Sequence, residues 1–110
     1  MKIIVNGIVW EIKYTHNRYD LSRDDGTLTW GVTDRSTQEI FIYDRLSPYM
    51  RQKVLTHELV HAWIFSYGIY LDVEQEEFVC SFIDTYAREI IAKADEVLAN
   101  AYRKNFYNLR

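Results

Sequence analysis

The sequence predicts an α+β fold in which an antiparallel β-sheet of two hairpins packs on two helices. Short runs of β-branched and aromatic residues fill the first half of the chain, apolar residues recur every three or four positions in the second half, and Ser47-Pro48 separates the two. Of the 110 residues, 48% are hydrophobic and 26% are charged, and no stretch is rich in glycine, serine or proline. We therefore expect residues 1–110 to form a single domain.

The first hairpin is predicted around Asn6-Gly7. Residues 3–5 and 8–12 are β-branched or aromatic at most positions, and they flank this pair on either side. Asparagine followed by glycine accepts positive φ angles at both central positions of a type I′ turn, whose twist matches that of two paired strands. The chain then becomes polar over residues 15–26, so we expect a loop there.

The second hairpin is predicted over residues 27–43. Strand character resumes at residues 27–33, and residues 39–43 form another run of β-branched and aromatic residues. Between them, Asp34-Arg35-Ser36-Thr37 is rich in residues that favour turns. These two runs complete the sheet that the sequence predicts.

The first helix is predicted over residues 48–67. Ser47 can accept hydrogen bonds from free backbone N–H groups, and Pro48 is tolerated at the first helical position. Gly68 marks the end, because glycine readily adopts the conformation that closes a helix. Between these signals apolar residues recur at helical spacing, namely Met50, Val54, Leu55, Leu59, Val60, Ala62 and Trp63.

The second helix is longer and is predicted over residues 73–99. Asp72 and Gln75 resemble a capping arrangement at its start. Residues 100–110 either continue this helix or form a short separate one. An apolar stripe of helical period runs through Val79, Phe82, Ile83, Tyr86, Ala87, Ile90, Ala94, Val97 and Leu98.

The first helix carries His57-Glu58-Leu59-Val60-His61, which matches the pattern H-E-x-x-H. Because the histidines are four residues apart, both imidazoles lie on one face of the helix and can hold one tetrahedral Zn²⁺. Glu58 is next to His57, so it cannot comfortably ligate the same ion but can reach a water molecule on it. The pattern predicts His57 and His61 as zinc ligands and Glu58 as the general base. The ordinary alternative is that both histidines are half-buried and satisfied by nearby carbonyl groups.

A catalytic zinc site usually takes a third protein ligand. The remaining histidine, His16, lies in the strand-rich half, so an acidic residue at the start of the second helix is the better source. Glu76 shares the apolar face of that helix, where a carboxylate is costly unless it is paired, whereas Glu77 points with polar residues. We expect Glu76 to be the third ligand, with Glu77 as its rival, although acids also favour a helix start through the dipole alone. Cys80 is expected to be a buried thiol, and a thiolate can also bind zinc.

Aromatic residues are expected mainly in the core rather than on a substrate-binding surface. This expectation concerns Trp10, Trp30, Trp63, Phe41, Phe65 and Phe82. A tyrosine near the site could stabilise an oxyanion. The sequence does not choose among Tyr67, Tyr70 and Tyr86.

Charge and cysteine content narrow the class of protein further. The chain has 13 basic and 16 acidic residues, a net charge of -3 at pH 7, which argues against non-specific nucleic-acid binding. Its single cysteine cannot form an intrachain disulfide. No apolar run has the length of a signal peptide or of a membrane span. We therefore expect a cytoplasmic protein that binds neither nucleic acid nor a membrane.

A strand-rich half followed by a helix with the sequence VLTHELVHAW resembles the small zincins, and most of all the ImmA/IrrE family of metallopeptidases, which is common in prophages. The second helix of that family opens with acidic residues and continues in a pattern of small and aromatic residues. The counterpart here is EEFVCSFI at residues 76–83, where the family usually has an acidic-Ala-Asn-x-Phe-Ala run followed by Leu-Met-Pro. The resemblance covers residues 28–95.

The resemblance implies a zinc-dependent metalloendopeptidase that cleaves a cytoplasmic protein, typically a helix-turn-helix transcriptional repressor. Glu58 would take a proton from water and return it to the leaving amine. We expect residues 39–43 to border the cleft and to pair with an extended segment of the substrate. The alternative is a non-catalytic, phage-type regulator of zincin fold that binds and inhibits a host protein. Glu58 argues against it, because a purely structural zinc site needs no general base.

Overall fold

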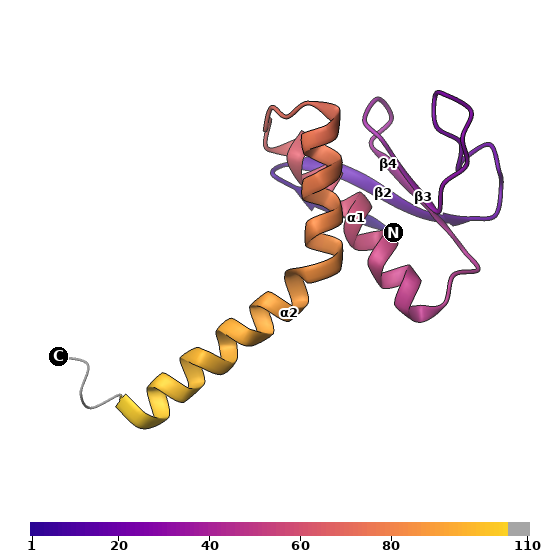
Figure 1. Ribbon diagram of the computed structural model, residues 1–110. Helices are drawn as coiled ribbons and strands as arrows, with labels where there is room; N and C mark the ends of the chain where they lie inside the picture. The colour runs from indigo at the N-terminus through magenta and orange to yellow at the C-terminus, as the bar shows by residue number, and fades with distance from the viewer. Residues whose placement is uncertain (106–110) are drawn as a thin grey trace.

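The computed structural model describes the backbone of residues 1–105 and the side chains of residues 1–103. Four strands form one sheet, and two helices follow it along the chain (Figure 1). The α+β class expected from the sequence is confirmed. The elements are β1 (Lys2–Val5), β2 (Ile8–Thr15), β3 (Gly31–Asp34), β4 (Glu39–Tyr43), α1 (Pro48–Ser66) and α2 (Val73–Asn105).

The sheet is mixed, which corrects the prediction of a purely antiparallel sheet. Its strand order is β1-β2-β4-β3. Both predicted hairpins are present, since β1 pairs antiparallel with β2 and β3 pairs antiparallel with β4, but β2 and β4 run parallel. This arrangement puts the two strands that bury most side chains in the middle, where Ile12 lies opposite Ile40. The short β3, with its sequence GVTD, takes an edge, where little of its surface has to be apolar.

The strand over residues 39–43 has no free edge. As β4 it hydrogen-bonds to β2 on one side and to β3 on the other. The expectation that these residues pair with substrate is therefore wrong, because an added strand needs unpaired backbone groups. Of the two edge strands, β3 has the more extensive contact with α1.

β3 is also shorter than predicted, since it begins at Gly31 rather than at residue 27. The β-branched residues before it bond to the preceding loop instead of to the sheet. The Thr29 N–H donates to the Leu21 carbonyl at 2.9 Å, and Ser22 and Leu28 form an isolated bridge. These residues therefore pair within the loop before β3 and do not lengthen the strand.

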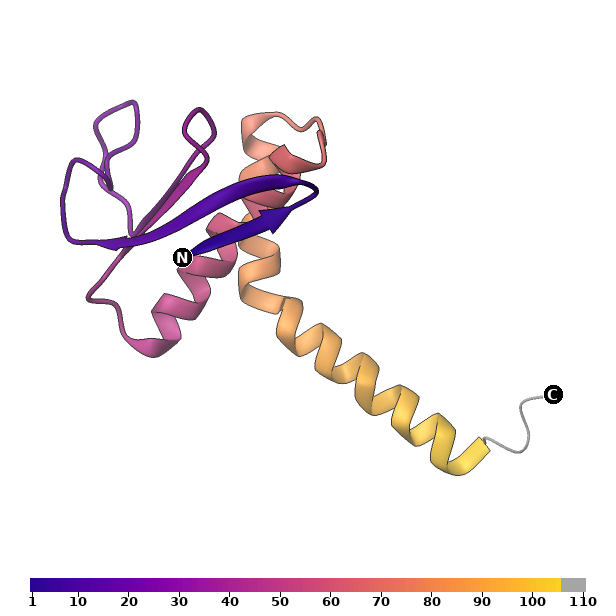
Figure 2. The ribbon, with the colours of Figure 1, turned by 180° about the vertical axis from the view of Figure 1, so that it is seen from behind.

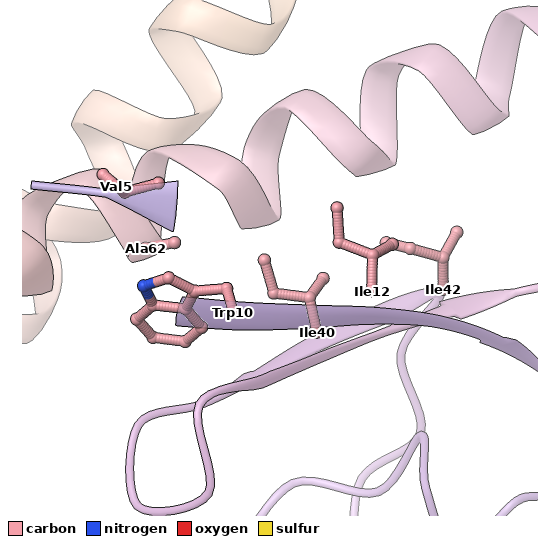
Figure 3. Close-up of a cluster of buried hydrophobic side chains, with 6 residues drawn as sticks. All are labelled: Val5, Trp10, Ile12, Ile40, Ile42 and Ala62. Carbon is pink, nitrogen blue, oxygen red and sulfur yellow. The ribbon is translucent and has the colours of Figure 1, made fainter. Parts of the chain in front are cut away.

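The core lies between one face of the sheet and α1 (Figure 3). Trp10 is fully buried there, and its Nε1 donates a hydrogen bond to Ser66 Oγ at 2.8 Å. This bond satisfies the indole N–H in an apolar setting and ties the last turn of α1 to β2. The buried cluster consists of Val5, Trp10, Ile12, Ile40, Ile42 and Ala62.

Turns and helix starts lie where local signals predict them. Asn6 and Gly7 have φ angles of 49° and 78°, as a type I′ turn requires. Ser47 caps α1 by accepting a backbone N–H of the first turn at 3.3 Å. At the start of α2, Asp72 Oδ1 accepts the Gln75 N–H at 2.8 Å, and Gln75 Oε1 accepts the Asp72 N–H at 3.1 Å. Both helices therefore begin at satisfied caps.

α2 is longer than predicted, because it continues to Asn105. Most of the segment 100–110 therefore extends the helix, and residues 106–110 lie outside the described part of the chain. The first half of α2 packs on α1, whereas its second half projects away from the sheet and α1 (Figure 2). Neither helix is long and apolar enough to cross a membrane within the residues that the structure describes.

Three of the six aromatic residues expected in the core are largely exposed. Trp30 is 55% exposed, Trp63 48% and Phe82 44%. Trp10 is buried, and Phe41 and Phe65 are half-buried. The reason is that one helix covers only one face of a four-stranded sheet, so the apolar interior is too small to hold every aromatic side chain.

Replacing Ile40 by alanine tests the position of the core. Ile40 has no exposed surface and lies at the centre of the sheet, so Ile40→Ala is expected to lower the free energy of unfolding by about 2–5 kcal/mol. Ile4 in β1 is 71% exposed, and Ile4→Ala is the matched control, expected to change it by less than about 0.5 kcal/mol. Urea denaturation measures both. Equal losses for the two variants would contradict the described packing.

Candidate metal centre

Both histidines of the H-E-x-x-H pattern lie on the side of α1 that faces α2. Their ring centroids are 5.2 Å apart, and both residues are half-buried. Glu77, at the start of α2, places its carboxylate across the two rings. Its Oε2 lies 3.2 Å from His57 Nε2, and its Oε1 lies 3.0 Å from His61 Nε2. One carboxylate thus meets the same ring nitrogen of both histidines.

The other ring nitrogen of each histidine meets a second carboxylate of α2. His57 Nδ1 lies 2.8 Å from Asp84 Oδ2, and His61 Nδ1 lies 2.5 Å from Glu76 Oε2. Each of these carboxylates also has a basic partner. Lys53 Nζ donates to Asp84 Oδ1 at 2.5 Å, and the Arg35 guanidinium donates to Glu76.

These contacts keep Glu76 and Asp84 ionised. Burial alone would raise the pKa of Glu76, but the hydrogen bonds from Arg35 and His61 outweigh it and lower the pKa below its ordinary value. Burial acts on Asp84 in the same way, and hydrogen bonds from Lys53 and His57 lower its pKa. Two anionic carboxylates therefore accept the Nδ1 protons of the histidines. In the tautomer with its only ring proton on Nδ1, each histidine has its free lone pair on Nε2, where it can bind a metal ion.

The two Nε2 atoms and the Glu77 carboxylate are then all acceptors, and they face one another at 3.0 and 3.2 Å. Acceptors at such distances repel one another unless a proton or a metal ion lies between them. Two imidazoles and one carboxylate are the ligand set of many catalytic zinc sites. The donor chemistry of this cluster therefore fits a divalent metal ion.

Cys80 lies beside this cluster as well. It is fully buried, and one ligand atom from each of His57, His61 and Cys80 lies within 4.8 Å of the others. Burial, together with the charges of Glu77 and Glu76, raises the pKa of the Cys80 thiol to about 12. Without a metal ion the sulfur therefore stays protonated, as expected for a buried thiol.

Glu58 packs against β3 and lines the same cavity as the two histidines. Its side chain is buried, and its Oε1 accepts a hydrogen bond from Thr33 Oγ1 at 2.9 Å. Burial raises the pKa of Glu58, and the bond from Thr33 opposes this only in part. Gly31 allows this close approach, because a Cβ there would lie 2.8 Å from Val54 Cγ1 and 2.9 Å from Glu58 Cγ.

Two cavities meet at this point. One of about 380 Å³ contains both histidines together with Glu76 and Glu77. The other, of about 750 Å³, extends toward the loop before β3 and the start of α1. The residues that line both are Arg23, Gly31, His57 and Glu58. The proposed base and one histidine therefore stand where a long chain could pass from one cavity into the other.

A family model described as the IrrE N-terminal-like domain, Peptidase_M78, matches residues 11–101. The chain belongs to this family. No curated protein and no solved structure matches the chain. The family match confirms the resemblance to the ImmA/IrrE proteins, and it extends beyond residues 28–95 in both directions. Membership supports a metallopeptidase-type role.

In this M78 protein the sequence-selected residues His57, Glu58, His61, Glu76 and Glu77 all lie at one place. Their roles differ by geometry, since Glu77 faces both Nε2 atoms while Glu76 faces Nδ1 of His61. None of the three candidate tyrosines lines the cavity that contains both histidines. Arg23 lines that cavity as well, whereas Thr33 and Arg35 in its wall already donate to Glu58 and Glu76.

Sequence reasoning missed the residues that support the histidines. Asp84 follows Glu77 by seven residues, which places both on one face of α2, and Lys53 precedes His57 by four residues on α1. These two spacings are sequence signals from which Asp84 and Lys53 could have been identified. Thr33 and Arg35 come from the hairpin of β3 and β4, and no spacing along the chain connects them with the helices.

The buried thiol of this M78 protein gives a test of the packing around the site. In metal-depleted protein at pH 8, Cys80 is expected to react with a disulfide reagent at least about tenfold more slowly than in denaturant, because it is fully buried and its pKa is raised to about 12. Absorbance of the released thiolate measures the rate. In denaturant the same thiol should react at the rate of free cysteine. A folded-state rate equal to the denatured one would show that Cys80 is not buried as described.

Proposed function

We propose that the protein is a zinc-dependent metalloendopeptidase whose substrate is a cytoplasmic protein. One observation carries this proposal: two Nε2 atoms and a carboxylate converge beside a buried glutamate that a threonine holds in place. A non-catalytic regulator of the same fold would need at most the converging Nε2 atoms and carboxylate, and it would not need the buried glutamate. A buried glutamate that lines the same cavity as the cluster suits a reaction in which a proton is moved.

His57, His61 and Glu77 are the ligands in our proposal. Asp84 and Glu76 accept the Nδ1 protons, so they orient the two rings and raise their basicity toward the metal ion. Glu76 therefore acts through His61 in this assignment, whereas the helical angle favours Glu76 itself as the ligand. The two assignments differ in what each carboxylate contributes to metal affinity.

Zn²⁺ held by His57, His61 and Glu77 would lower the pKa of a water molecule and polarise the scissile carbonyl group. Glu58 accepts the proton of that water and returns it to the nitrogen of the departing amine. Its buried side chain makes it a stronger proton acceptor than an exposed glutamate, because its pKa is raised by burial. Thr33 donates to one carboxylate oxygen and so leaves the other free to take the proton. Arg23, which lines both cavities, is a donor for the developing oxyanion.

The substrate is bound in an extended form along β3. β3 is an edge strand beside α1, and it carries Gly31 and Thr33 next to Glu58. Backbone pairing with such an edge gives affinity, and side-chain cavities give selectivity. The 750 Å³ cavity supplies one, with Leu28 and Trp30 among its lining residues. A transcriptional repressor is the target class that the family resemblance implies.

The proposal is tested first on the base. Glu58→Gln keeps the size of the side chain but removes the proton acceptor, so it is expected to reduce peptide cleavage at least about a hundredfold while zinc content stays near one ion per chain. Elemental analysis of protein purified without a metal-affinity tag measures zinc, and mass spectrometry of a digested peptide library measures cleavage. Glu89→Gln, on the exposed side of α2, is the control and should behave as wild type.

Two outcomes would count against the enzyme. Absence of zinc even after its addition would refute the metal centre itself. Full zinc content with no cleavage by the wild-type protein, and equal behaviour of Glu58→Gln, would instead favour the non-catalytic regulator. The two measurements therefore separate the metal site from the reaction.

The third ligand is tested by a matched pair of variants. Glu77→Gln removes a direct ligand in our assignment and is expected to weaken zinc binding more than Glu76→Gln does. For Glu76→Gln a loss of about 10–100-fold is expected, as for other carboxylates that orient a histidine ligand. Competition with a chromogenic chelator measures both affinities. A larger loss for Glu76→Gln would return the ligand position to Glu76 and leave Glu77 as a surface residue.

A further inference from the structure

The outer half of α2 presents an apolar face to solvent. Residues 88–100 are all exposed, and large side chains are among them: Ile90 is 51% exposed, Ile91 60% and Val97 59%. Ile90 and Val97 also line a groove of about 770 Å³ to which α2 alone contributes. Figures 1 and 2 show this part of α2 projecting away from the sheet and α1. A helix with such a stripe is stable in water chiefly when another element covers it.

Small and large side chains alternate along this face with a seven-residue repeat. Alanine stands at three positions seven residues apart, and a β-branched residue stands at three others with the same spacing. Together they give the alternating steps of three and four residues that two pairing helices require. We call this row the Ala/Ile seam, and it consists of Ile83, Ala87, Ile90, Ala94, Val97 and Ala101. Its middle three members are exposed, whereas Ile83, Ala87 and Ala101 are half-buried.

We propose that the Ala/Ile seam pairs with the same seam of a second copy of this chain, with the two α2 helices antiparallel. In that direction one register sets a small residue against a large one in every layer. Ala94 then lies opposite Ile90 of the other copy, Ala87 opposite Val97, and Ala101 opposite Ile83. A parallel pair would set alanine against alanine and isoleucine against isoleucine, which alternates gaps with crowding. The face is therefore complementary to itself in one orientation.

The charges of α2 favour the same orientation. Residues 73–91 contain five acids and one base, whereas residues 92–105 contain three bases and two acids. Antiparallel pairing directs the basic end of each helix toward the acidic start of the other, and the helix dipoles also oppose each other. The seam itself carries no charge. Lys93, which flanks it, is neutralised by Glu96 at 2.9 Å within the same helix.

The length of the Ala/Ile seam limits the strength of the dimer. The seam spans 19 residues from Ile83 to Ala101, which is about 28 Å of helix. Interfaces of this limited size belong to the weak, transient class, so we expect a dissociation constant on the order of micromolar or above. Glu77 lies more than one turn before the seam begins, so the metal centres stay at the two far ends of the pair. The dimer does not depend on zinc or on peptide cleavage.

Sedimentation velocity of the full chain tests the pairing over concentrations from about 1 μM to 1 mM. The wild type is expected to pass from monomer to dimer. Ile90→Glu and Val97→Glu each put a charge into the seam and should weaken association at least about tenfold. Ala92→Glu and Ala99→Glu put the same charge on the opposite face of α2 and should leave it unchanged. Far-UV circular dichroism confirms that each variant retains its helices.

Disulfide trapping tests the direction. An equimolar mixture of Ala87→Cys and Val97→Cys proteins is oxidised mildly and analysed by mass spectrometry. Antiparallel pairing yields the mixed dimer, because these two positions share a layer, and neither variant alone should crosslink efficiently. Crosslinks within each variant but not between them would overturn the antiparallel arrangement. A wild type that stays monomeric at every concentration, or equal weakening by the seam variants and their controls, would overturn the dimer.

Discussion

The helix α1 packs against the sheet and against α2 at the same time, and the rest of the structure depends on this double contact. Toward the sheet it presents Ala62, whose small side chain lets the buried strands approach closely. Toward α2 it presents His57 and His61. Each residue turns a helix by about 100°, so a small rotation of α1 would exchange these faces. The bond from Trp10 to Ser66 fixes the last turn of α1 and thereby also fixes the direction of both imidazoles.

A charge balance at the site follows from that orientation. Four carboxylates surround the two histidines, and basic side chains neutralise two of them, with Arg35 at Glu76 and Lys53 at Asp84. The other two, Glu58 and Glu77, have no lysine or arginine partner among the described contacts. Glu77 faces both Nε2 atoms, and Glu58 lines the same cavity. A divalent cation there would balance the two remaining charges, so the distribution of basic residues supports the metal as much as the ligand distances do.

The sequence predicts the local features of this fold well and the order of the strands poorly. The φ angles at Asn6-Gly7, the cap at Ser47 and the reciprocal bonds of Asp72 and Gln75 depend on neighbours within a few residues, so the pattern determines them. The parallel pairing of β2 with β4 depends on which strands take the two central positions of the sheet, where both edges of a strand are paired. This pairing joins strands of two different hairpins, so no turn sequence predicts it.

The candidate site shows the same division between local and non-local information. Helical spacing correctly places His57 and His61 on one face of α1, and it correctly identifies Glu76 as buried, with only 7% of its surface exposed. Periodicity reports whether a side chain is covered, however, and not what covers it. Glu77, which contacts both histidines, lies about 100° around α2 from the apolar stripe that carries Glu76. It does so because the surface of α1 that it contacts is polar. A polar residue on a helix can therefore face the candidate metal centre as readily as solvent, and only the packing of the two helices shows which it faces.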